Sequence, residues 1–194
     1  MDWLRPGVRT VFERLPAGTT SACVNEPVDR GAGYSTFALI RELSGSGGAG
    51  SLGDHLPAAV DDAVASQQHV SESEDYRWAT SVDRSGLDQV LGLWRQDEPP
   101  AFTWWNTTLT DSGHHAGGPG SPIARAALRD ADARLGVFLD LLEERGLVDD
   151  TVVLLTADHG MEAATPGCTG DWDAALEAAG VPFRDEAYGF LYLG

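Results

Sequence analysis

Two acid–histidine pairs are the groups in this sequence best suited to chemistry. Asp111 precedes His115 by four residues, and Asp158 is followed directly by His159. Carboxylate and imidazole ligands together suit Zn²⁺, Mn²⁺ or iron rather than Ca²⁺ or Mg²⁺, which prefer oxygen alone. Two such ions roughly 4 Å apart can hold a phosphoryl group, activate a bound water and stabilise a leaving oxygen. The pairs therefore predict ligands for two divalent metal ions, with zinc the first choice and manganese or iron the alternatives.

Each pair follows a segment that is expected to be a strand. Residues 101–107 are apolar and aromatic and come after two prolines, which predicts a strand. Residues 151–156 form a continuous apolar run, typical of a central strand buried on both faces. The carboxyl ends of parallel strands meet at one edge of a sheet, where open α/β sheets gather their binding sites. We therefore expect the two pairs to converge in space. Neighbouring glycines such as Gly113 would let the backbone approach metal and substrate.

Hydrophobic periodicity predicts the remaining elements. The clearest helix begins with Ser121 as N-cap and Pro122 at its first position, and Gly146 ends it. Other helices are expected at residues 6–15, 35–43, 56–65, 86–94 and 172–179, and further strands at 19–24 and 187–193. Strands that alternate with helices predict an α/β fold with a mostly parallel central sheet and helices on both faces. The length suits a single domain over residues 1–194.

Composition limits the classes of partner. The chain has 194 residues, 42% of them hydrophobic, and a formal net charge of −17. Such a charge would repel a nucleic-acid polymer, so none is expected to bind, and an anionic substrate would require concentrated positive charge at the site. No apolar run approaches the roughly 20 residues of a transmembrane helix. The two cysteines, Cys23 and Cys168, lack metal-binding spacing, which leaves two thiols or one disulfide open.

Two segments resemble motifs of a known superfamily. Residues Thr156–Glu162 (TADHGME) resemble the (T/S)-x-D-H-G-M motif of the alkaline phosphatase superfamily, nearest to its type I phosphodiesterase/nucleotide pyrophosphatase branch. Residues Asp111–Pro119 (DSGHHAGGP) are similar to that branch's D-x-x-G-H-x-x-G-P motif, except that His114 replaces the glycine. The register makes His115 the ligand. His114 and Gly160 would then support the ligands or face the substrate.

The resemblance implies an alkaline-phosphatase-like core, present in part, and metal-dependent hydrolysis of a small phosphate ester, nucleotide or phosphodiester. Asp158 and His159 would bind the metal that also holds the nucleophile. Asp111 and His115 would bind the metal that faces the attacking water.

In the family, a serine or threonine nucleophile comes from an earlier segment, with a D-G strand end and a P-T-x-T turn. This sequence has neither, and it has no histidine after His159. We therefore expect a fragment that lacks the N-terminal nucleophile segment. The first residues contain no signal peptide, which leaves the compartment open.

Other interpretations remain open for the same residues. Thr20 is the one candidate nucleophile, although no acidic partner precedes it. Asp54 and His55 form a further adjacent pair, which an N-cap aspartate before a helix explains better. The alternative to an enzyme is a non-catalytic or inactive truncated domain of the same fold that binds a metal or an anion.

Overall fold

The structure is a computed structural model that describes residues 7–36, 74–165, 167, 170–186 and 190–193. The chain divides into two compact units, residues 1–161 and residues 162–194, and each is described by itself. The helix expected at 56–65 lies outside the described residues, as do Asp54, His55, Cys168 and most of the helix expected at 35–43.

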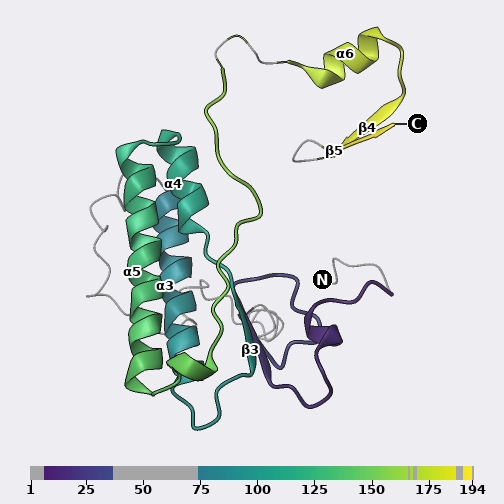
Figure 1. The fold of residues 1–194 in the computed structure, drawn as a ribbon. Coiled ribbons are helices and arrows are strands. Elements are labelled where there is room, and N and C mark those ends of the chain that lie inside the picture. The colour runs from purple at the N-terminus through teal and green to yellow at the C-terminus, as the bar shows by residue number, and fades with distance from the viewer. Residues whose placement is uncertain (1–6, 37–73, 166, 168–169, 187–189, 194) are drawn as a thin grey trace, which may run out of the picture. The chain divides into compact units, whose positions relative to one another are not determined.

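The first unit contains a parallel three-stranded sheet. Its strands are β1 (Ser21–Val24), β2 (Tyr34–Ser35) and β3 (Phe102–Trp105), in the order β2-β1-β3. Strand β3 is labelled in Figure 1. The central strand β1 is buried at all four positions, because it has a neighbour on either side and side chains packed on both faces. The expectation of an α/β fold with a parallel sheet is confirmed.

Three α-helices accompany the sheet among the described residues of the first unit. They are α3 (Glu74–Trp94), α4 (Leu109–Gly117) and α5 (Pro122–Glu144). Helix α5 begins as expected, since the Ser121 hydroxyl accepts a hydrogen bond from the amide of Ala124 at 3.1 Å. Gly146 follows its end with φ +66°, the left-handed conformation that stops a helix. None of the described helices is long and apolar enough to cross a membrane.

Side chains of β3 alternate between two packed layers. Trp105 contacts Phe138 of α5 edge-to-face, with ring centroids 6.2 Å apart, within a core that includes Val24 of β1. Phe102 lies three positions earlier, on the opposite face, and packs edge-to-face on Phe12 at 5.7 Å. Both faces of this strand are therefore covered, one by the long helices and the other by the N-terminal segment.

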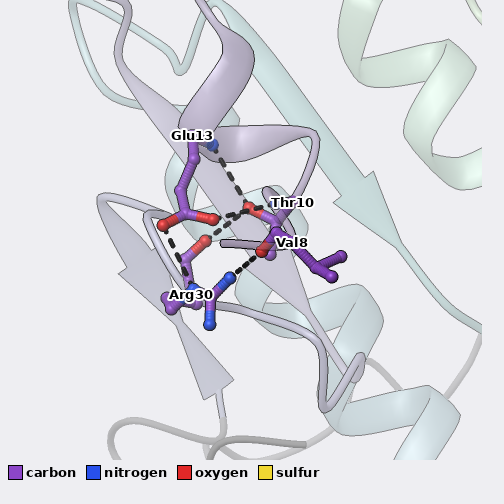
Figure 2. Close-up of polar contacts among 4 residues, drawn as sticks. All are labelled: Val8, Thr10, Glu13 and Arg30. Carbon is purple, nitrogen blue, oxygen red and sulfur yellow. Dashed lines mark hydrogen bonds and ion pairs between the residues drawn. The ribbon is translucent and has the colours of Figure 1, made fainter. Parts of the chain in front are cut away.

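A short 3₁₀ turn, η1 (Phe12–Arg14), replaces the longer helix expected at residues 6–15. Figure 2 shows the contacts that fix it: the amide of Glu13 donates to the Thr10 hydroxyl, and the amide of Thr10 donates to the Glu13 carboxylate. Arg30 binds the same carboxylate and the carbonyl of Val8. The Thr10 hydroxyl also donates to the carbonyl of Arg30 at 2.6 Å. These tertiary contacts hold the segment as a single turn.

The apolar run at residues 151–156 is not a strand, so that prediction is wrong. Within the described part of the chain it pairs with no strand, and β3 has a neighbour only in β1. Val152, Leu154 and Leu155 are 85–87% exposed. An apolar composition favours burial, but a strand also needs a partner for its backbone hydrogen bonds, and here none is present among the described residues.

The start of helix α3 was not expected from the sequence. The prediction covered residues 86–94, whereas the helix begins at Glu74. Its first half contains polar residues that are buried, among them Thr80, Asp83 and Ser85. Because buried polar residues break the hydrophobic pattern on which the prediction relied, the pattern was visible only in the second half.

In the second unit, the described residues form one helix and one pair of strands. Helix α6 (Trp172–Ala178) is capped by Asp171, whose carboxylate accepts from the amide of Ala174 at 3.0 Å. Strands β4 (Phe183–Glu186) and β5 (Phe190–Leu193) pair antiparallel. The helix and the last strand were expected, whereas β4 was not.

Cys23 is a buried free thiol in the central strand. Burial, followed by the negative charges of Asp29 and Glu26, raises the pKa of this thiol to about 12. At neutral pH it is therefore protonated and is a packing residue rather than a nucleophile.

Candidate active site

Helix α4 carries the first acid–histidine pair. It begins four residues after β3 ends, so Asp111 and His115 follow the carboxyl end of that strand, as expected. The two side chains lie one helical turn apart on α4. The Nε2 atom of His115 is 3.6 Å from Oδ1 of Asp111, and the two side chains are 67% and 49% exposed.

The separation of these two atoms fits shared coordination of one ion. At 3.6 Å, nitrogen and oxygen are too far apart for a good hydrogen bond. Two ligands on neighbouring positions of a tetrahedral zinc ion, each bonded at roughly 2.1 Å, lie about 3.4 Å apart. Asp111 and His115 therefore present a donor set and a spacing that suit two positions of one metal ion.

His114 points in a different direction from its neighbour. Successive residues of an α-helix are turned by about 100° around the axis. Its ring nitrogen Nδ1 lies 2.6 Å from the carbonyl oxygen of Thr110, which can only accept, so Nδ1 carries the proton. The half-buried ring is held by its own helix, which leaves Nε2 as the atom able to contact another group.

The second pair lies on an exposed bend after residues 151–156. His159 Nε2 is 3.6 Å from Asp158 Oδ2, the same separation as in the first pair. The amide of His159 donates to Asp158 Oδ1 at 3.0 Å, and its ring Nδ1 lies 2.8 Å from the carbonyl oxygen of Gly160. A histidine that binds a metal usually donates its other ring N–H to such a carbonyl. The contact with Gly160 therefore leaves Nε2 free to act as a ligand.

Charges from both acid–histidine pairs act on the pKa of His159. The pKa of His159 is raised, first by the hydrogen bond to the Gly160 carbonyl, then by the carboxylate of Asp158, and further by that of Asp111. The charge of Asp111 thus acts on a histidine 48 positions later in the sequence. Both pairs belong to the first compact unit.

The described residues do not gather the four side chains into one cluster. No group of three or more His, Cys, Asp or Glu able to hold a metal ion occurs among them. Each acid–histidine pair therefore stands by itself in the described part of the chain. The reason lies in residues 151–156, because a segment without a strand partner does not place its end beside that of β3.

Thr20, the candidate nucleophile, lies at the other end of the sheet. It precedes β1 and so sits at the amino end of the strand, whereas Asp111 follows a carboxyl end. The Thr20 hydroxyl accepts a hydrogen bond from the amide of Ala101 at 3.1 Å, and the Thr20 carbonyl accepts from the amide of Phe102. The structure therefore does not bring Thr20 together with the acid–histidine pairs.

Gly113 serves the packing of two helices. A Cβ atom at this position would lie 2.6 Å from the Cβ of Ala127 and 3.3 Å from the carbonyl oxygen of Ile123, both on α5. Both distances are closer than ordinary van der Waals contact. The absence of a side chain at Gly113 thus lets α4 approach α5, within the helix that carries Asp111 and His115.

We expect Gly113→Ala to destabilise the protein by about 1–2 kcal/mol, because the cost of overpacking exceeds the helix preference of alanine. Denaturant unfolding of the full chain measures this change. Gly136→Ala is the matched control, since a methyl group at this position of α5 would meet nothing within 4 Å. The control should be neutral or stabilise by up to about 1 kcal/mol. Equal effects of the two substitutions would contradict the packing role.

Asp83 is a residue that the sequence interpretation missed. Its buried carboxylate on α3 accepts hydrogen bonds from the first residues of α4. Its partners lie 25 and 26 positions further along the chain, so no local pattern could have indicated the contact.

Comparison with known proteins places the chain in a family. A family model for type I phosphodiesterase / nucleotide pyrophosphatase matches residues 3–188, which is nearly the whole sequence. No curated protein and no solved structure matches this chain. The match agrees with the α/β fold and its parallel sheet. The chain belongs to the type I phosphodiesterase / nucleotide pyrophosphatase family.

Proposed function

We propose that this chain contributes Asp111, His115, Asp158 and His159 to a two-metal site for the hydrolysis of phosphate esters or phosphodiesters. The observation that carries the proposal is the repeated geometry: two carboxylate–imidazole pairs, each with its nitrogen and oxygen 3.6 Å apart. Membership of the family supports phosphoric-ester hydrolysis in general.

Each pair would hold one ion. Bound zinc, or in its place manganese or iron, supplies charge that stabilises the phosphoryl oxygens and lowers the pKa of a water. The carbonyl of Gly160 keeps the proton of His159 on Nδ1. The unprotonated Nε2 would then bind the same ion as Asp158. His114, whose Nδ1–H donates to the carbonyl of Thr110, keeps Nε2 as an acceptor that would bind a hydroxyl of the substrate or a water. The remaining ligands and the nucleophile are not assigned.

The charge of the chain supports a metal-centred site. A net charge of −17 repels a phosphate ester, since the sequence has 13 arginines, no lysine and 30 acidic residues. The first arginine after the glycine-rich turn that follows α4 is Arg125. Its guanidinium donates a hydrogen bond to the carbonyl of Gly120. Two divalent ions would supply the positive charge that the substrate requires. We therefore propose a nucleotide, phosphate ester or phosphodiester as the small-molecule substrate.

Chelation tests this proposal. Treatment of the full chain with EDTA is expected to abolish hydrolysis of bis(p-nitrophenyl) phosphate, and added Zn²⁺ or Mn²⁺ to restore it. p-Nitrophenyl phosphate, assayed in parallel, distinguishes diester from monoester preference. Hydrolysis that survives complete removal of metal would refute the two-metal proposal. Bound zinc with no hydrolysis of either ester would instead favour the alternative, a non-catalytic metal-binding domain of the same fold.

A further inference from the structure

We propose that Asp83 is a positioning residue that fixes α4 and thereby the metal-binding pair Asp111 and His115. The inference rests on the proposed function of that pair. Asp83 lies on α3 and acts through the first residues of α4, Thr108 and Leu109.

The start of α4 depends on this side chain from another helix. The first N–H groups of an α-helix have no partner within the helix, and a side chain at the N-cap usually supplies one. Here the N-cap residue, Thr108, makes no such bond with its own side chain. Asp83 replaces it: Oδ1 accepts from the amide of Thr108 at 2.8 Å and from its hydroxyl at 3.1 Å, and Oδ2 accepts from the amide of Leu109 at 3.0 Å.

Both carboxylate oxygens of Asp83 are committed to α4 in the protein interior. The residue is fully buried. Burial raises the pKa of Asp83, whereas the hydrogen bonds from Thr108 and Leu109 and the positive charge of Arg134 act in the opposite direction. The partial positive charge at a helix N-terminus also favours a carboxylate there. The buried carboxylate of Asp83 thus accepts three hydrogen bonds from the start of α4 and holds α3 and α4 together. We call this contact the clamp.

The clamp sets the position of the exposed pair. Leu109, held by Asp83, is fully buried in a cluster with Tyr76 and Ala79 of α3 and Ile123 and Ala127 of α5. Asp111 follows two residues later, and His115 is one turn further along the same short helix. A helix of nine residues that loses its first anchored turn can tilt or fray, and a small displacement changes the separation of two ligand atoms.

The test measures zinc affinity in the full chain carrying His159→Ala. This substitution removes the proposed ligand of the second ion, so that the measured binding is that at Asp111 and His115. Asp83→Asn keeps the shape of the side chain but removes its charge and one acceptor. We expect it to weaken zinc binding by roughly 10–100-fold, the usual cost of losing a group that orients metal ligands. Thr108→Val removes only the hydroxyl donor and should weaken binding less. Thr108→Val also tests the inference if the Asp83→Asn protein does not fold.

Two controls separate positioning from stability. Leu141→Ala removes a buried side chain from the cluster of Leu87, Leu91 and Leu141, which does not include α4. It should lower stability at least as much as Thr108→Val and leave the zinc affinity unchanged. Equal weakening by Leu141→Ala, or unchanged affinity in both the Asp83 and Thr108 variants, overturns the inference. Asp111→Ala in the same background tests the pair itself: unchanged zinc binding there would show that the proposed function, rather than the clamp, has failed.

Discussion

Replacing Arg134 with methionine is expected to lower the free energy of unfolding by about 3–5 kcal/mol. Arg134 and Asp130 are both fully buried on α5, and NH1 lies 3.0 Å from Oδ2. The substitution keeps most of the packing of the side chain but removes the cation that pairs directly with the carboxylate of Asp130, on which the charge of Arg84 also acts. A buried charge without a partner is far more costly than the pair is stabilising.

The same guanidinium also acts on α3, because its positive charge partly opposes the rise in the pKa of Asp83 that burial causes. Urea unfolding of the full chain measures the loss. The double substitution Asp130→Leu/Arg134→Met removes both charges and should recover much of the stability. Arg129→Met, at an exposed position of the same helix, should change stability by less than about 0.5 kcal/mol. An Arg134→Met protein as stable as the Arg129→Met control would contradict the account of this ion pair.

The fold was predictable from the sequence where local chemistry determines it. Helix α5 was located correctly because an N-cap serine, a proline at the first position and a glycine after the end are signals within a few residues. Strand β1 was recognised from a short run of small and β-favouring residues, and β3 from its apolar and aromatic composition. Residues 151–156 have the same composition, yet they are not a strand, because strand formation depends on a partner that composition does not specify.

For the candidate site, the setting of the two acid–histidine pairs was only partly predictable from the sequence. The acid–histidine motifs identified both pairs, and the carboxyl end of β3 located the first of them correctly. The helix that carries this pair was not expected, since Gly113 and Gly117 disfavour a helix in isolation. Close packing on α5 and the contacts of Asp83 override that preference. Both are tertiary effects, which a local pattern does not contain.

Loss of one metal ion is the second large effect that we expect, on replacing either residue of the Asp158/His159 pair with alanine. Each substitution removes one of the two protein ligands that the pair offers, and a single ligand on an exposed bend holds zinc only weakly. His159→Ala also removes the ring that the Gly160 carbonyl orients. Because both side chains are exposed, the fold itself should be unaffected.

The direct test of the two-metal account is the zinc content of the full chain after dialysis against a fixed, low concentration of free zinc, measured by inductively coupled plasma mass spectrometry. We predict a lower zinc content in both Asp158→Ala and His159→Ala than in the unsubstituted chain. Asp140→Ala, which removes an exposed carboxylate from α5, should leave the content unchanged. Unchanged zinc in both pair variants would contradict the assignment of Asp158 and His159 as metal ligands.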